Sequence, residues 1–266
     1  MKALKVLGRF HWGYWIRGVE VSKLQYSLRV PPPTTLVGAI SYPLFKIIGD
    51  EGETLSGLYS PVKKILDVIR HAVFSLNDYG MYLEDINVYI LLHFQQLGGK
   101  EEFERYGTYR RYAMKYRTGA VKTGKIYAPN AEFTIIYFID EKVALKELGS
   151  DWDSILTKAC YEISRIGSKE SIVSINKVLI YDAIESKVEE VETKYYFPLY
   201  AAIPVLGNWF FEKFWKGGFG KDDLARSIEY VIPGILDPIH SELIKVKVSD
   251  KGVTYTVGDE AVIIGV

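Results

Sequence analysis

The sequence is poor in several features that assign a chain to a familiar class of protein. It has one cysteine, Cys160, so no disulfide can form within the chain, and its helical surroundings predict a buried thiol. The longest apolar runs, such as residues 135–139, are far shorter than the roughly 20 residues that a membrane helix needs. Charged residues interrupt the N-terminus at Lys2, Lys5 and Arg9, before any apolar stretch of signal-peptide length. We therefore expect a cytoplasmic protein that makes no membrane contact.

The chain also lacks net charge and clustered metal ligands. Lys and Arg together number 33, as do Asp and Glu, so the formal charge is zero. Because a neutral chain is not coated with positive charge, any nucleic-acid site must be local. The histidines His11, His71, His93 and His240 are scattered, and the sequence has no paired cysteines. The sequence predicts no metal site and no cofactor.

Apolar periodicity predicts an α+β fold. Strand patterns occupy residues 3–10, 86–94, 131–140 and 171–182. Helical spacing occupies residues 35–48, 60–74 and 150–166. In the first of these helices, Thr34 and Thr35 are candidate N-caps, and Gly38 is expected to permit close packing. With residues 60–74 taken as an inserted helix, the order is β, α, β, β, α, β, which predicts a ferredoxin-like domain related to RNA-recognition folds.

The C-terminal third follows a different pattern. Short strands are predicted at residues 188–193, 244–248 and 253–257, within a Pro-, Gly- and aromatic-rich stretch. We expect a small β-rich domain over residues 183–266, after a first domain over residues 1–182. The aromatic cluster from Trp209 to Trp215 is interpreted as core, with a protein-docking surface as the alternative.

The most unusual segment runs from Arg105 to Ala131 and contains basic residues but no acidic residue. Its candidate RNA-binding residues are Arg105, Tyr109, Arg110, Arg111, Lys115, Arg117, Lys122 and Lys125. Guanidinium groups bind phosphates and aromatic rings stack on unpaired bases, so this mixture favours single-stranded RNA. The alternative is a solvated hairpin whose tyrosines cover a neighbouring surface, because charge runs are often exposed faces.

A second candidate site is the loop Arg165–Ser171. Gly167 would let backbone N–H groups approach a ligand, and Ser168 and Lys169 could hold a phosphate. The alternative is a helix C-cap glycine followed by a polar turn.

These segments together resemble the Cas5 family of CRISPR-associated proteins, which belongs to the RAMP superfamily. The block Pro31–Ile40, the basic insertion and the loop Gly167–Ser171 carry the resemblance, which covers about residues 1–182. The remaining tail resembles archaeal type I-A members only loosely. Proteins of this family are subunits of Cascade-type surveillance complexes in antiviral defence.

The resemblance implies a non-catalytic subunit that binds the 5′ handle of CRISPR RNA (crRNA) and seals one end of a filament of backbone subunits. Its inserted hairpin, the thumb, would span about residues 98–129 and contact the adjacent backbone subunit. The glycine-led loop would lie near the handle. Expected partners are therefore crRNA, the backbone subunit and the large subunit of the complex.

One branch of the family also cleaves precursor RNA, with a Tyr, a Lys and a His of which the last two are adjacent. In this chain Lys115 is followed by Tyr116, and no histidine lies between His93 and His240. Because the usual proton shuttle is missing, we expect no cleavage. Two alternatives remain: a metal-independent endoribonuclease that uses Tyr42, Lys115 and Tyr116, and a protein-interaction module whose basic hairpin binds an acidic partner.

Overall fold

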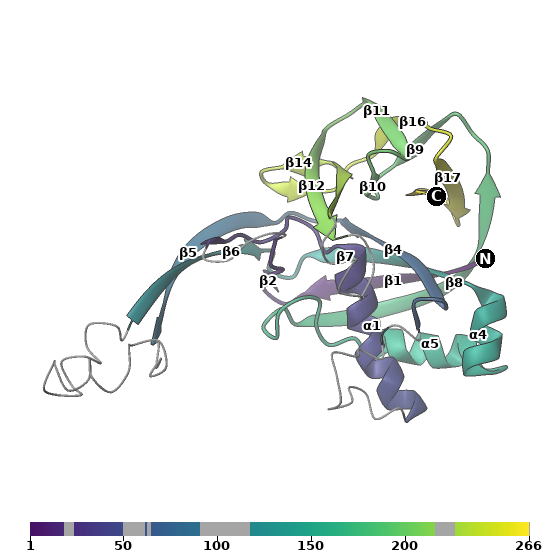
Figure 1. Ribbon diagram of the computed structural model, residues 1–266, viewed down its shortest axis with the longest axis horizontal. Coiled ribbons are helices and arrows are strands. Elements are labelled where there is room, and N and C mark those ends of the chain that lie inside the picture. The colour runs from purple at the N-terminus through teal and green to yellow at the C-terminus, as the bar shows by residue number, and fades with distance from the viewer. Residues whose placement is uncertain (19–23, 50–61, 63–64, 91–117, 216–226, 266) are drawn as a thin grey trace, which may run out of the picture.

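A six-stranded antiparallel sheet, in the order β18-β17-β8-β1-β7-β4, forms the centre of the molecule (Figure 1). The computed structural model describes residues 1–18, 24–49, 62, 65–90, 118–215 and 227–265. The strands of the central sheet are β1 (Lys2–Phe10), β4 (Ile69–Leu76), β7 (Glu132–Ile139), β8 (Val173–Ser186), β17 (Gly252–Val257) and β18 (Glu260–Gly265). The strands predicted at residues 3–10, 131–140 and 171–182 are confirmed as β1, β7 and β8, although β8 continues past residue 182.

The first strand shows why this sheet is central. Leu4, Val6 and Phe10 are fully buried, and they alternate with partly covered residues such as Lys5 and Arg9. β1 pairs with β7 along one edge and with β8 along the other. Both of its backbone edges are therefore hydrogen-bonded, and the alternation places one row of apolar side chains under the helices.

One face of the sheet in Figure 1 is covered by helices, which in the described ranges are α1 (Pro33–Ile48), α4 (Glu141–Leu148) and α5 (Trp152–Tyr161). α1 is fastened to the sheet because the hydroxyl of Tyr137 donates to the carbonyl of Leu36 at 2.9 Å. The helix begins at Pro33, and its N-cap is Pro32, so neither Thr34 nor Thr35 caps it. It ends at Ile48, where the helix predicted over residues 35–48 also ends, and its C-cap is Gly49, whose φ of 72° is left-handed.

The helix predicted over residues 60–74 is wrong, because β4 (Ile69–Leu76) is a strand at the edge of the central sheet. Apolar residues at Ile69, Val73 and their neighbours match helical spacing, but the run from Ala72 to Leu76 is buried at every position. A strand covered on both faces loses its two-residue alternation, so its pattern cannot be told from that of a buried helix. This segment is a strand because it pairs with β7.

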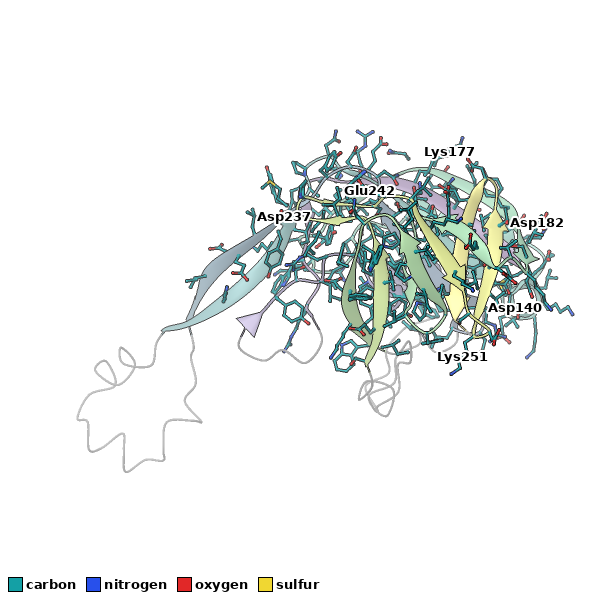
Figure 2. The ribbon with its side chains drawn as sticks, turned by 90° about the horizontal axis from the view of Figure 1, so that it is seen from above. Asp140, Lys177, Asp182, Asp237, Glu242 and Lys251 are labelled. Atoms are coloured by element: carbon teal, nitrogen blue, oxygen red, sulfur yellow. The ribbon has the colours of Figure 1, made fainter. Side chains whose placement is uncertain are left out.

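A long hairpin projects from the body, as Figures 1 and 2 show from two directions. It consists of β5 (Met81–Ile90) and β6 (Thr118–Tyr127). β6 also pairs with β2 (Gly13–Tyr14) and β3 (Leu24–Gln25). The strand predicted at residues 86–94 begins earlier, and its expected place in the β, α, β, β, α, β unit is wrong because β5 pairs with β6 outside the central sheet. Residues 91–94 lie outside the described residues.

The C-terminal strands cover the face of the central sheet that the helices leave open (Figure 1). They are β9 (Glu190–Thr193), β10 (Phe197–Pro198), β11 (Ala202–Leu206), β12 (Trp209–Trp215), β13 (Ser227–Pro233), β14 (Ile235–Leu236), β15 (Ile239–His240) and β16 (Ile244–Val248). The predictions at residues 188–193, 244–248 and 253–257 are confirmed as β9, β16 and β17. β17 pairs with β8, so the C-terminal segment also completes the central sheet.

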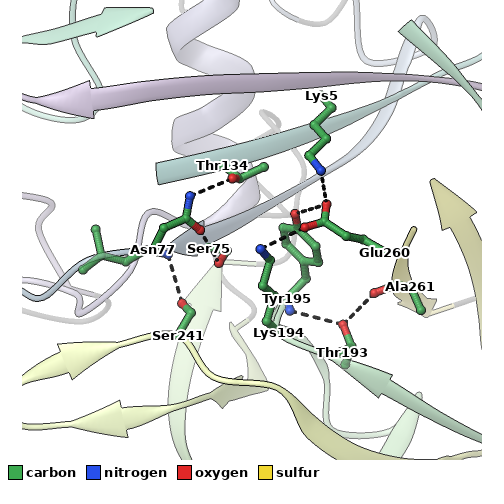
Figure 3. Close-up of polar contacts among 11 residues, drawn as sticks. Lys5, Ser75, Asn77, Thr134, Thr193, Lys194, Tyr195, Ser241, Glu260 and Ala261 are labelled. Atoms are coloured by element: carbon green, nitrogen blue, oxygen red, sulfur yellow. Dashed lines mark hydrogen bonds and ion pairs between the residues drawn. The ribbon is translucent and has the colours of Figure 1, made fainter. Parts of the chain in front are cut away.

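Polar contacts join this C-terminal layer to the central sheet (Figure 3). Glu260 accepts contacts from Lys5 at 2.7 Å, from Lys194 at 2.8 Å and from the hydroxyl of Tyr195 at 2.8 Å. Burial acts to raise the pKa of Glu260, but these hydrogen bonds outweigh it and lower the pKa below the usual value. One carboxylate therefore connects β1, β18 and the segment after β9.

The aromatic cluster on β12 divides between core and surface. Phe214 is fully buried, and its ring lies 4.8 Å from that of Tyr230 and 5.4 Å from that of Tyr196. Phe211, by contrast, is 50% exposed. The interpretation as core holds for Phe214 and fails for Phe211. Within the described ranges, no helix combines the length and the apolar character needed to cross a membrane.

Candidate RNA-binding site

A cavity of about 610 Å3 opens beside α1. Three segments that are distant in the sequence surround it: residues 15–17 after β2, residues 35–43 of α1, and residues 164–168 after α5. The side chains that matter chemically in its lining are Trp15, Arg17, Thr35, Tyr42, Arg165 and Ser168. The fold thus places two of the sequence candidates, Gly167 and Ser168, at a cavity.

Gly167 has a structural reason to be glycine. Its φ is +101°, and an added Cβ would lie 2.7 Å from Cγ1 of Ile16 and 2.9 Å from the carbonyl oxygen of Trp15. The backbone N–H of Ser168 donates to that same carbonyl at 3.1 Å. Because α5 ends at Tyr161 with Glu162 as its C-cap, the alternative interpretation of Gly167 as a helix C-cap is wrong. Gly167 instead lets the loop pack directly on the segment after β2.

The serines of the loop hold its shape. Ser171 is buried, and its hydroxyl accepts from the backbone N–H of Trp15 at 3.1 Å. The hydroxyls of Ser168 and Ser171 lie 3.0 Å apart and share a hydrogen bond. Lys169 is exposed in the same turn but does not line the cavity. The loop therefore offers its backbone and Ser168 to the cavity, and Lys169 to the surface beside it.

The face of α1 that borders the cavity is open. Gly38 is exposed, and no atom lies within 4 Å of the position that a Cβ would occupy. The expectation that Gly38 permits close packing is wrong, since it leaves room in the cavity instead. Tyr42, one turn further along α1, is 72% exposed and lines the same cavity. The first turn of α1 has no acidic residue, so nothing there offsets the positive end of the helix dipole.

The chemistry of the lining suits a nucleic-acid strand. Arg17 and Arg165 are both exposed at the cavity, and guanidinium groups bind phosphates through two parallel hydrogen bonds. Tyr42 and Trp15 add aromatic surface on which a base can stack. None of the described cavity residues is acidic or a histidine. The described ranges also contain no group of three His, Cys, Asp or Glu residues placed to hold a metal ion.

In the described part of the hairpin, β5 places acidic residues next to the basic segment, which has no acidic residue of its own. Lys122 is exposed and forms an ion pair with Glu84 on the opposite strand. This hydrogen bond raises the pKa of Lys122 and lowers that of Glu84. The basic segment therefore does face acidic residues, because β5 brings them alongside. Lys125 is partly exposed and lies opposite Leu83.

The other candidates in the basic segment are not among the described residues; they are Arg105, Tyr109, Arg110, Arg111, Lys115 and Arg117. The same holds for Tyr116, while Tyr42, the third member of the alternative catalytic set, lies at the cavity.

Sequence reasoning did not single out Arg17, Thr35 and Arg165, which line the cavity, as candidate site residues. Thr35 lies in the Pro31–Ile40 block that had been singled out, and Arg165 starts the glycine-led loop. Nothing in the sequence pointed to Arg17, because Arg17 comes close to the loop after α5 only through the packing of residues 15–17 against that loop.

Comparison with known proteins agrees with this architecture. The model of the CRISPR-associated protein family Cas_Cas5 matches residues 4–246. The chain belongs to the Cas5 family. Among curated proteins, this Cas5 chain is 31% identical to the CRISPR system aCascade subunit Cas5 1 of Saccharolobus solfataricus, over 97% of this chain and 98% of the relative. It is also 31% identical to CRISPR-associated protein Cas5 3 of the same organism, with the same coverage.

A solved structure shares the fold of this Cas5 chain. The crystal structure of a CRISPR protein from Archaeoglobus fulgidus superposes with a TM-score of 0.59, covers all of both chains and is 19% identical. At that identity the likeness shows a common fold.

Proposed function

We propose that this Cas5 chain is a non-catalytic subunit of a type I Cascade complex that binds the 5′ handle of crRNA and caps the filament of backbone subunits. The observation that carries this proposal is the cavity beside α1, which is lined by arginines and aromatic rings. A relative that aligns over nearly the whole chain is named as a subunit of such a complex, which supports the same conclusion.

The handle is a single strand, and the cavity has the two kinds of group that bind single strands. Arg17 and Arg165 would meet phosphates, while Tyr42 and Trp15 would stack on bases. The Gly167 loop would lie along the backbone of the RNA, with Lys169 at its outer side. This arrangement requires no metal ion.

Two parts of the molecule are open to protein partners in this proposal. The hairpin, which projects from the body in Figure 1, would reach from the handle site to the adjacent backbone subunit, and the C-terminal strands would contact the large subunit. The element order β1, α1, β4, β7, α5, β8 and the strand order β8-β1-β7-β4 support a ferredoxin-like unit over residues 1–182. Residues 183–266 would then form the second, β-rich domain.

Blocking the cavity tests the proposal without removing any charge. Gly38→Gln should fold normally, since no atom lies within 4 Å of the added Cβ and glutamine favours helix. Its side chain would occupy the cavity, and the loss of one stacked base should weaken binding of a labelled handle RNA about tenfold or more. Ser154→Gln, at an exposed position of α5, is the matched control and should bind as wild type does.

A salt titration tests whether the cavity cations meet phosphate. Arg165→Ala should flatten the slope of log affinity against log salt by about 0.7, the contribution of one phosphate contact on a single strand. An unchanged slope together with normal binding by Gly38→Gln would contradict the site. Incubation with labelled precursor RNA in chelator separates binding from the alternative endoribonuclease, because a trimmed product would show that the chain is catalytic.

A further inference from the structure

The side chain of Arg29 connects the projecting hairpin to the rest of the molecule. Its guanidinium carbon lies 3.5 Å from the centre of the Tyr82 ring, which belongs to β5. A second guanidinium contact runs from Nη1 to the carbonyl of Ser27 at 3.2 Å. At this distance the planar guanidinium lies against the ring face, which is the geometry of a strong cation–π contact.

The Tyr82 ring also lies against the other strand of the hairpin. A Cβ added to Gly124 of β6 would lie 2.3 Å from the hydroxyl oxygen and 2.7 Å from a ring carbon of Tyr82. The ring of Tyr82 therefore crosses the hairpin over Gly124, where any residue with a Cβ would clash with it. Tyr82 of β5 thus contacts Arg29 and also lies over Gly124 of β6, so it links the segment of Arg29 to both strands of the hairpin.

The backbone of Arg29 is anchored in turn. Its N–H donates to Oε1 of Glu212 on β12 at 2.7 Å, and its carbonyl accepts from the hydroxyl of Tyr14. The carbonyl of Pro31 accepts from the buried hydroxyl of Tyr196 at 3.0 Å. Since α1 begins at Pro33, the anchored segment leads directly into the helix that borders the cavity.

We propose that Arg29 is a positioning residue, which fixes the angle between the β5–β6 hairpin and the cavity beside α1 so that one RNA strand can contact both. The proposal rests on the proposed RNA-binding function, which supplies the strand. It assigns to Glu212, and so to the C-terminal layer, the task of holding Arg29 in place.

Stability alone does not account for this arrangement. Nε of Arg29 and Oε2 of Glu212 are both covered, and among the described residues neither has a hydrogen-bond partner. Covered charged groups with unsatisfied atoms lower stability, and apolar side chains of similar size commonly replace such groups at no cost. An apolar side chain, however, could not replace the planar guanidinium of Arg29 in holding the ring of Tyr82 at one angle.

A distance measurement tests the positioning directly. Spin labels on introduced cysteines at Asp85 of β5 and Lys158 of α5, both exposed, report the angle of the hairpin. The native Cys160 is buried and its thiol pKa is raised, so it should stay unlabelled. We expect a narrow distance distribution in the otherwise wild-type protein and in Tyr82→Phe, which keeps the ring. Arg29→Lys and Tyr82→Leu should both broaden it.

RNA binding by the same variants shows whether the angle matters. Arg29→Lys and Tyr82→Leu should each weaken binding of the handle RNA about tenfold. The double variant should bind no more weakly than either single variant, because both substitutions remove the same contact between the guanidinium and the ring. Tyr127→Leu, on the opposite face of the hairpin, is the matched control for the distance and should leave it narrow. Thermal unfolding checks that each variant is folded, and Arg29→Lys is the milder one if Tyr82→Leu unfolds.

The outcomes separate the two proposals. A distribution that stays narrow in folded Arg29→Lys overturns the positioning role, whatever the RNA does. A broad distribution with unchanged affinity shows that the angle does not serve RNA binding, which also overturns it. If the wild-type protein binds no handle RNA while the variants still broaden the distribution, the proposed function has failed and Arg29 fixes the hairpin for another reason.

Discussion

Burial of single polar atoms shifts the pKa values of His71 and Glu212 in opposite directions, and the effects of the two shifts on stability should nearly cancel. His71 of β4 is partly exposed, but its Nε2 is covered and lacks a partner among the described residues, and burial lowers its pKa from 6.5 to about 4. Glu212 of β12 is also partly exposed with a covered Oε2, and burial raises its pKa from 4.5 to about 7, against the opposing effects of the backbone N–H and the charge of Arg29. Each shift makes the free energy of unfolding depend on pH.

The signs follow from which state binds the proton. Between pH 6.5 and 4 the unfolded chain protonates His71 before the folded one does, so stability falls as the pH is lowered. Between pH 4.5 and 7 the folded chain holds a proton on Glu212 that the unfolded chain has lost, so stability falls as the pH is raised. From pH 7.5 to pH 5, His71 should remove about 2 kcal/mol and Glu212 should add about 2 kcal/mol.

Single variants should uncover each effect. Urea unfolding at pH 5 and pH 7.5 gives the change in free energy of unfolding for each protein. Relative to wild type, His71→Phe should gain about 2 kcal/mol on going to pH 5, and Glu212→Gln should lose about 2 kcal/mol. The exposed residues His11 and Glu229 provide the controls His11→Gln and Glu229→Gln, which should follow wild type. The reasoning is refuted if both buried variants keep the wild-type dependence on pH.

Three further predictions concern other parts of the fold. Gly167→Ala should lower stability by about 2 kcal/mol or more, because the added Cβ is strained at a positive φ and clashes with its neighbours. Gly49→Ala, whose Cβ would meet no atom within 4 Å, should lower stability less, and thermal unfolding of the two variants makes the comparison. Glu260→Gln should cost about 2 kcal/mol in urea unfolding because Lys5 and Lys194 lose their shared anion, and the exposed Glu190→Gln should change far less. Replacing Arg110 and Arg111 by Ala should flatten the salt slope of RNA binding by about 1.4, and equal slopes in two folded proteins would exclude phosphate contacts there.

Local sequence patterns were sufficient to predict those elements that have one buried face and one more exposed face. β1 is buried on alternate residues, and α1 has an apolar stripe between a proline start and a glycine stop, so period and capping chemistry identify both. The glycine-led loop was singled out from its own residues, and two of them, Gly167 and Ser168, line the cavity. Its structural reason, the close approach of Gly167 to Trp15, could not be inferred from the sequence.

The sequence failed where burial or pairing depends on distant segments. β4 was taken for a helix because a strand covered on both faces shows no alternation, and only its pairing with β7 makes it a strand. The basic segment was counted as free of acidic partners because Glu84 lies on the other strand of the hairpin.

The sequence by itself determined which chemical groups this Cas5 chain carries: a local excess of cations and tyrosines, a glycine-led loop and no clustered metal ligands. Only the tertiary structure decided which of them meet. Arg17, Tyr42 and Arg165 come from three segments, and packing of the loop after α5 against residues 15–17 and α1 brings them to one cavity. The physical reason is that sequence periodicity reports the burial of a residue within its own element, whereas a site forms from contacts between elements.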